Sequence, residues 1–90
     1  MIIKNCKIIF KDGIKNGSIL IKDGKISKIN PKKYDDEIID AKGLYLSPGF
    51  IDVHIHGAGG YDTMDGTSYS INTISKVIMK HGTTSFLPTT

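Results

Sequence analysis

The sequence contains no tryptophan, and its 12 basic residues include no arginine. The net charge of +3 therefore comes from lysines, which are scattered along the chain rather than clustered. Proteins that bind nucleic acids usually carry a basic stripe with arginine forks and aromatic platforms. The composition therefore argues against a nucleic-acid partner.

Cysteine and long apolar runs are also scarce. The single Cys6 has no cysteine partner for an internal disulfide or a metal site, which is typical of a reducing compartment. The opening stretch MIIKNCKIIFKDG is interrupted by Lys4, Asn5 and Lys7. It provides neither the apolar core of a signal peptide nor the roughly 20 apolar residues that span a bilayer. We therefore expect a cytoplasmic protein with no membrane partner.

The first 48 residues have the pattern of a small β-rich domain. Residues 2–10 predict a strand with Ile2, Ile8 and Phe10 on one face, because side chains alternate across a strand. Short strands with one apolar face need a second layer to cover them. We therefore interpret residues 1–48 as a partial β-sandwich domain.

Turn signals divide this region. Asp23-Gly24 lies between two β-rich runs and predicts a type I′ hairpin, since glycine takes the positive φ that this turn requires. Lys42-Gly43 predicts a turn between two short strand segments. The polar residues 31–37 begin with proline and predict an exposed connection.

Residues 49–90 follow a different pattern, beginning after Pro48-Gly49. A strand and a glycine-rich loop precede a helix that Thr67 or Ser68 can cap and that runs to about Lys80. The helix carries an apolar stripe, formed by Ile71, Ile74, Val77 and Ile78. A second β-rich run ends at Pro88. This order predicts a βαβ unit with parallel strands.

The first of these strands carries the residues that point to chemistry. Strict alternation places Phe50, Asp52, His54 and His56 on one face and Ile51, Val53 and Ile55 on the other, which we expect to pack beneath helices. Histidines two apart on a strand share a face and can converge on one metal ion, although the same spacing also occurs in histidines without a metal. Gly57, Gly59 and Gly60 follow, and we expect them to leave room for a ligand.

Other polar residues allow two interpretations each. Asp52 could hold a ligand ring or bond to a neighbouring strand. His81 stands at the predicted helix end, where capping is the simpler role. Asp62 and Asp65 follow the loop, where helix-start roles are more common than substrate contact.

The string LSPGFIDVHIHGAGGYDTMD, residues 46–65, resembles the start of the amidohydrolase superfamily. Its members open a metal-bearing (β/α)8 barrel with Pro-Gly, Asp and a His-x-His pair. The resemblance therefore implies an α/β fold in which strands of a small β-sandwich precede the start of the barrel. Residues 49–90 would form the first βα unit and the second strand.

Within the superfamily, HGAGGYDTMD and HGTTSFLPTT resemble the N-acetylglucosamine-6-phosphate deacetylase family. That resemblance implies metal-activated attack of water on the acetamide of a sugar phosphate, releasing acetate and leaving glucosamine 6-phosphate. It makes His54 and His56 metal ligands for one or two zinc or iron ions, and it implies a homodimer.

The later metal ligands and the catalytic aspartate of that family lie beyond residue 90. We therefore expect this chain to be the N-terminal piece of a longer enzyme and to be inactive alone. Two alternatives stay open: another amidohydrolase, of the dihydroorotase, hydantoinase or adenine deaminase type, or a small non-enzymatic β-rich binding module.

Overall fold

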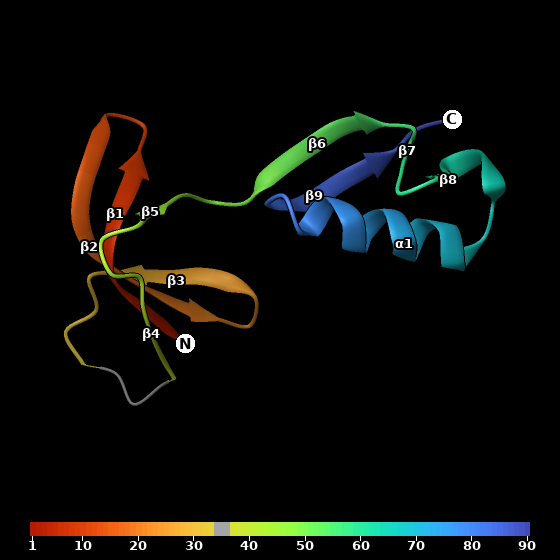
Figure 1. Cartoon of the computed structure of the whole chain (residues 1–90). Helices are drawn as coiled ribbons and strands as arrows, with labels where there is room; N and C mark the ends of the chain where they lie inside the picture. Colours follow the sequence, from red (N-terminus) through yellow and green to blue (C-terminus); the bar gives the residue numbers. More distant parts are fainter. Residues whose placement is uncertain (34–36) are drawn as a thin grey trace. The chain divides into compact units, whose positions relative to one another are not determined.

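The computed structural model describes residues 1–33 and 37–90. The chain divides into two compact units, Met1–Ser47 and Pro48–Thr90 (Figure 1). The exposed connection predicted at residues 31–37 falls in part on residues 34–36, which lie outside the described residues. No helix in the described ranges is long and apolar enough to cross a bilayer.

The first unit is a mixed β-sheet with strand order β3-β2-β1-β4, in which β5 also pairs with β1. Its strands are β1 (Ile2–Phe10), β2 (Gly13–Lys22), β3 (Lys25–Ile29), β4 (Ile38–Asp40) and β5 (Tyr45–Leu46). β1, β2 and β3 are antiparallel neighbours, whereas β4 and β5 run parallel to β1. A second sheet layer is not present among residues 1–33 and 37–47.

Both predicted turns of the first unit are confirmed. Asp23 and Gly24 have φ values of 52° and 71°, the positive pair that a type I′ turn requires between β2 and β3. Lys42 and Gly43 have φ values of 51° and 82°, and the Leu44 amide donates to the Ala41 carbonyl across that turn.

A bulge in β1 overturns the predicted apolar face of this strand. The pairing register with β2 shifts by one residue between Ile3 and Cys6, and Asn5 there has a φ of 56°. An extra residue reverses the alternation beyond it. Ile3, not Ile2, therefore packs with the core of the sheet, which contains Cys6, Ile8, Phe10, Ile19, Ile21, Ala41 and Leu46. Ile2 is fully buried but pairs with Leu20 outside this cluster.

The carboxylate of Asp40 holds this bulge. Its Oδ1 accepts hydrogen bonds from the Asn5 side-chain amide at 3.0 Å and from the Lys42 backbone amide at 2.9 Å. The Gly43 amide also donates to the Asn5 carbonyl. Hydrogen bonds therefore hold the turn at residues 41–44 against the bulge in β1.

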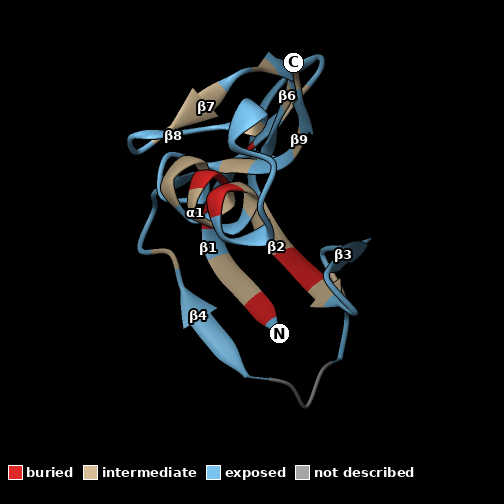
Figure 2. Ribbon diagram, turned by 90° about the vertical axis from the view of Figure 1, so that its right-hand side faces the viewer, coloured by how far each residue is buried: buried red, intermediate tan, exposed pale blue. Residues whose placement is uncertain are grey.

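The second unit is a βαβ unit with a small hairpin inserted after its first strand. Its elements are β6 (Phe50–Ile55), β7 (Gly57–Ala58), β8 (Tyr61–Asp62), the 3-10 helix η1 (Thr63–Asp65), α1 (Ser68–Met79) and β9 (Thr83–Pro88). β6 and β9 are parallel, as predicted, and β7 and β8 form an antiparallel pair. Figure 2 shows buried residues on α1 as well as on β1 and β2.

The helix forms where the sequence predicts it. The Thr67 hydroxyl accepts from the Ser70 amide at 3.1 Å and so caps the first turn. Ile74, at the centre of the predicted stripe, is 1% exposed. At the other end, the His81 and Gly82 amides donate to the Ile78 and Met79 carbonyls.

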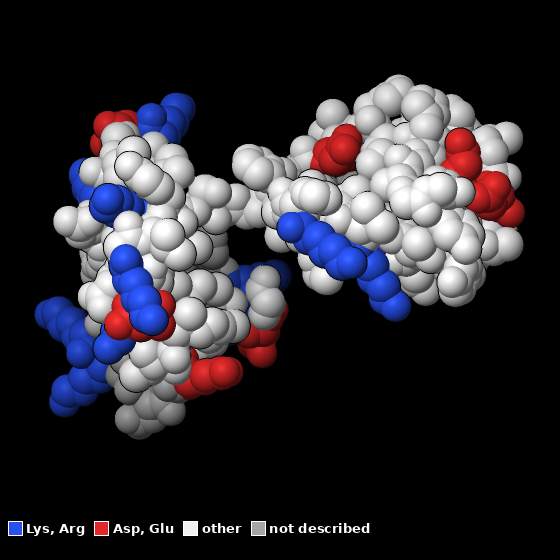
Figure 3. All heavy atoms as spheres, viewed as in Figure 1, with Lys and Arg blue, Asp and Glu red and all other residues white. Residues whose placement is uncertain are grey.

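Charged side chains are dispersed over both units. On the face shown in Figure 3, lysines lie at separate places on the first unit and along α1, without forming a continuous basic stripe. This view agrees with the scatter of lysines in the sequence.

The Asp40 contacts predict a pH dependence of stability. The hydrogen bonds from the Asn5 side chain and the Lys42 amide lower the pKa of Asp40 in the folded protein. The stabilisation is therefore present above the unfolded pKa of about 3.9 and is lost as the pH falls through the lower, folded value. Asp40→Asn keeps the acceptor oxygen but does not titrate. We expect its free energy of unfolding in urea to fall less than that of the wild type below about pH 4.

The matched control is Asp12→Asn, which removes the same charge at the turn between β1 and β2. An Asp40→Asn variant with the same acid dependence as the wild type would contradict the proposed role of the Asp40 carboxylate.

Candidate metal centre

β6 is not a regular strand. Asp52 pairs with Phe86 and Ile55 pairs with Pro88, so three steps along β6 match two steps along β9. One residue is therefore extra in β6, which is a β-bulge. A second irregularity separates Phe50 from Ile51.

The bulge breaks the predicted apolar face of β6, because it separates Ile55 from Ile51 and Val53. Ile51 and Val53 are 69% and 68% exposed, and within this chain they do not pack beneath helices. Asp52 and Ile55 are instead the half-buried residues of the strand. They lie three positions apart, a spacing that strict alternation would place on opposite faces. An extra residue between them accounts for the change.

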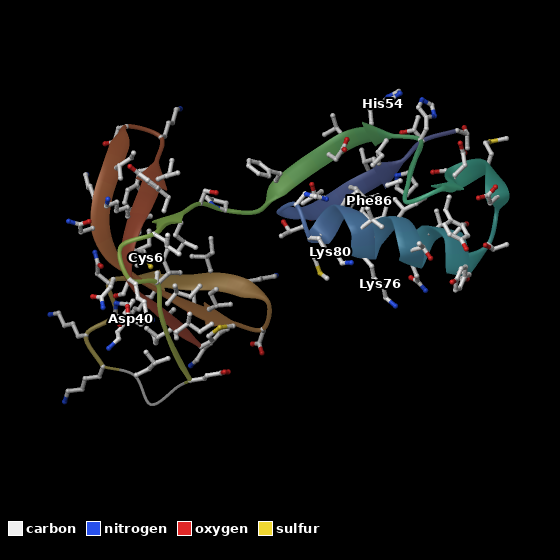
Figure 4. All side chains as sticks on the ribbon, in the orientation of Figure 1. Cys6, Asp40, His54, Lys76, Lys80 and Phe86 are labelled. Carbon is white, nitrogen blue, oxygen red and sulfur yellow. The ribbon has the colours of Figure 1, made fainter. Side chains whose placement is uncertain are left out.

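His54 and His56 nevertheless converge, as their spacing predicts. Their Nε2 atoms lie 3.3 Å apart, and the two rings meet edge to face with centroids 5.0 Å apart. Ordinary strand geometry separates the bases of such side chains by roughly 6.6 Å. Figure 4 shows His54 near the end of β6, extending away from α1.

The ring of His56 is oriented by the end of the neighbouring strand. Its Nδ1 lies 3.1 Å from the Thr89 carbonyl oxygen. A carbonyl can only accept, so the Nδ1–H of His56 donates and the Nε2 lone pair is left available. The Thr89 amide in turn donates to the Ile55 carbonyl at 2.8 Å. A histidine held by Nδ1 on a backbone carbonyl is the usual arrangement of a metal ligand.

The distance between the two Nε2 atoms suits a transition metal. At a metal–nitrogen distance of about 2.0–2.1 Å, nitrogens 3.3 Å apart subtend roughly 104–111° at the ion, close to the tetrahedral angle. Two neutral imidazoles are donors that zinc and iron accept. The histidine pair therefore fits two corners of a tetrahedral site.

The described residues supply only these two corners. No group of three or more His, Cys, Asp or Glu side chains within residues 1–33 and 37–90 is placed to hold an ion. His81 does not join the pair, because its neighbour Gly82 accepts from the Phe50 amide at the opposite end of β6. The backbone of His81 closes the helix, as the simpler interpretation predicts.

Asp62 and Asp65 start η1. The Asp62 carboxylate accepts from the Met64 amide, and Asp65 accepts from the Asp62 amide, both at 2.8 Å. This reciprocal pair is a capping box. The helix-start interpretation of both aspartates is therefore the one observed.

Nearby, a hydrogen bond with Tyr69 raises the pKa of the Tyr61 hydroxyl.

The glycines after His56 allow close packing of the chain itself. A Cβ on Gly57 would lie 2.2 Å from the Tyr61 carbonyl oxygen, and one on Gly59 would lie 2.7 Å from Val77 Cγ2. The expectation that these two glycines leave room for a ligand is therefore wrong. Gly59 and Gly60, with φ values of 63° and 83°, form the turn of the β7–β8 hairpin. A Cβ on Gly60 would meet no atom within 4 Å.

Sequence reasoning missed two residues beside the histidines. Thr89 follows β9, and parallel pairing of β6 with β9 could have placed it next to the end of β6. Thr63 binds the residue that follows β6, since its amide donates to the His56 carbonyl at 2.8 Å. Its buried hydroxyl has no hydrogen-bond partner among the described residues, and no sequence signal marks this residue.

Comparison with known proteins identifies the family. The sequence model that describes the amidohydrolase family matches residues 37–86, a range that contains both histidines. The chain belongs to the amidohydrolase family. Membership confirms the resemblance that the Pro-Gly, Asp and His-x-His string indicates.

Individual amidohydrolases resemble the chain to different extents. An N-acetylglucosamine-6-phosphate deacetylase of Bacillus subtilis is 43% identical over all of this chain and 24% of its own length. The crystal structure of the Pasteurella multocida deacetylase matches 97% of the chain with a TM-score of 0.85 and 28% identity, over 24% of its own length. The L-hydantoinase structure from Arthrobacter aurescens matches 61% of the chain at 43% identity with a TM-score of 0.52, over 13% of its own length.

The match to the deacetylase structure confirms the fold class predicted from the sequence. It includes both the β-rich unit and the βαβ unit, whereas the hydantoinase match covers less of the chain. The chain spans about a quarter of the length of the deacetylases it matches.

The short distance between Val77 and a Cβ added at Gly59 predicts that substitution of Gly59 destabilises the folded protein. Gly59→Ala and Gly60→Ala both place alanine at positive φ, which costs about 1–2 kcal/mol. Only the Gly59 substitution also meets a side chain, so we expect it to lower the free energy of unfolding by a further 1–3 kcal/mol or so. Urea denaturation of both variants measures the difference.

The double variant Gly59→Ala/Val77→Ala provides the control, because it removes the methyl group that the new Cβ would meet. We expect Gly59→Ala to cost less in the Val77→Ala background than in the wild type. Equal costs in both backgrounds would show that the contact does not explain the glycine.

Proposed function

We propose that this chain forms the first part of a metal-dependent deacetylase that hydrolyses N-acetylglucosamine 6-phosphate to glucosamine 6-phosphate and acetate. The observation that carries the proposal is the pair of Nε2 atoms 3.3 Å apart at the end of β6, within the segment that matches the amidohydrolase family. The deacetylase similarity over the whole chain supports the choice of reaction.

In this proposal His54 and His56 hold a divalent transition metal, zinc or iron, with one or two ions in the intact enzyme. The metal, when bound, lowers the pKa of water and polarises the amide carbonyl. The Thr89 carbonyl holds the Nδ1 proton of His56, which keeps its Nε2 available as a donor. The hydrogen bond from the Thr63 amide to the His56 carbonyl holds the backbone of this residue.

The remaining groups of the reaction come from elsewhere in the intact protein. Zinc sites in hydrolases generally use three protein ligands and keep one open position, so two histidines need at least one more ligand. A general acid or base must also move a proton from water to the departing amine. We therefore propose that the 90-residue chain alone does not turn over the substrate.

The proposed substrate is a small sugar phosphate, and the proposed compartment is the cytoplasm. Cys6 is free, and its burial raises the pKa of the thiol, which suits a structural cysteine of a reducing compartment. The homodimer that the family resemblance implies remains part of the proposal.

Removing either histidine should abolish most of the activity of the intact protein. Outer-shell residues alone change metal affinity by roughly 10–100-fold, so we expect His54→Ala and His56→Ala to lower kcat/KM for N-acetylglucosamine 6-phosphate by at least about 100-fold. Acetate release measures activity, and elemental analysis measures bound metal. His81→Ala, at the opposite end of β6, should keep both.

The substrate is tested separately from the metal. A protein that binds metal and releases no acetate from N-acetylglucosamine 6-phosphate, but opens a hydantoin or dihydroorotate ring or deaminates adenine, would overturn the deacetylase assignment. A protein in which His54→Ala and His56→Ala leave metal content unchanged would overturn the metal centre itself.

A further inference from the structure

The residue that the proposed mechanism leaves unused is Asp52. It precedes His54 by two positions and is half-buried, although the residues on both sides of it are exposed. Its Oδ1 accepts a hydrogen bond from the His54 backbone amide at 3.1 Å. This contact differs from both roles considered from the sequence, which were a bond to a ligand ring and a bond to a neighbouring strand.

The contact spans the bulge in β6. The regular register ends at Asp52, which pairs with Phe86, and resumes at Ile55, which pairs with Pro88. The extra residue lies between them, in the segment that contains His54. Bulges are uncommon between parallel strands, and next to active sites they re-aim a side chain. A carboxylate that accepts the amide two residues ahead is a local turn, which stabilises such a departure from the strand.

The two histidines are therefore held in different ways. His56 is held through its ring by the Thr89 carbonyl, so its direction follows from a contact with the neighbouring strand. His54 is held through its backbone by Asp52, and its Nε2 has the His56 Nε2 at 3.3 Å. The position of His54 relative to His56 depends on the shape of the backbone between Asp52 and Ile55.

We propose that Asp52 is a positioning residue whose carboxylate oxygen, by binding the His54 amide, holds the β6 bulge that brings the two imidazoles to one point. The inference rests on the proposed metal centre and extends it to a residue that touches neither the ion nor the substrate. What matters in this role is an acceptor atom at the right distance from the His54 amide, not a negative charge near the ion.

Two substitutions separate the acceptor from the charge in the full-length protein. Asp52→Asn keeps an acceptor oxygen in place and removes the charge. Asp52→Glu keeps the charge and moves the acceptor one methylene farther from the strand. Asp52→Ala removes both, and Asp12→Asn, in the first unit, controls for the loss of one negative charge.

Two readouts test positioning independently of turnover. In the metal-free protein, nuclear Overhauser contacts between the His54 and His56 ring protons report whether the imidazoles converge. Titration with cobalt(II), followed by its visible absorption, reports metal affinity and the coordination spectrum.

We expect Asp52→Asn and Asp12→Asn to keep the ring contact and to bind cobalt within about 3-fold of the wild type. Asp52→Glu and Asp52→Ala should lose the ring contact and bind cobalt about 10–100-fold more weakly, with an altered spectrum. Thermal unfolding identifies any variant that does not fold. If Asp52→Ala does not fold, the comparison of Asp52→Asn with Asp52→Glu still decides between the acceptor oxygen and the charge.

Four outcomes would overturn the inference. Asp52→Glu could bind cobalt like the wild type, or Asp52→Asn could lose as much affinity as Asp52→Ala, which would make charge the relevant property. If the wild type binds no cobalt at all, the proposed metal centre falls together with this role of Asp52. If the wild type binds cobalt and every Asp52 variant does too, only the role of Asp52 falls.

Discussion

The arrangement of the candidate site depends on one extra residue in β6. A regular strand would hold His54 and His56 as parallel projections, with the ladder to β9 unbroken. The bulge between Asp52 and Ile55 removes that constraint, and three hydrogen bonds replace it, from the His54 amide, the His56 ring and the Thr89 amide. The strand is therefore held mainly at its end, where the two Nε2 atoms meet.

The hydrogen bond from a backbone amide to the aspartate two residues before it occurs at three places in the chain. Asp40, Asp52 and Asp62 each accept a hydrogen bond from the backbone amide two residues ahead, at 2.9, 3.1 and 2.8 Å. The first binds a turn beside the β1 bulge, the second spans the β6 bulge, and the third starts η1. Aspartate suits all three positions, because its short side chain reaches its own backbone and offers the chain an alternative to the sheet ladder. These aspartates shape the backbone at points where regular strand pairing is interrupted or ends.

Features that are set by residues close together in the sequence could be predicted, whereas features that are set by strand pairing could not. The hairpin at Asp23-Gly24 and the helix capped by Thr67 depend on residues within a few positions of one another, and both were predicted correctly. The apolar faces of β1 and β6 were predicted by counting alternate residues, and a bulge in each strand reverses that count. A bulge is set by the pairing of two strands, which a single sequence does not show.

The candidate site shows the same limit. The His-x-His spacing predicted that the two rings share one face, because alternate positions on a strand need no knowledge of the rest of the fold. Their approach to 3.3 Å also depends on the bulge, which the spacing does not show. Gly57 and Gly59 could not be interpreted in this way. Whether a missing Cβ leaves space for a ligand or for the chain depends on Tyr61 and Val77, which the hairpin and α1 bring against them.

The two proposed ligands at the end of β6 have a consequence for how the intact protein would bind metal. The rings are already within chelating distance, so the two-histidine half of the site loses little conformational freedom when an ion binds. The described residues provide no third ligand, and an ion with two protein ligands is held weakly. The rest of the affinity must come from groups that approach the exposed end of β6. Metal binding would then also stabilise the contact between this βαβ unit and the segment that brings those groups, because binding and folding are coupled wherever ligands from different segments share one ion.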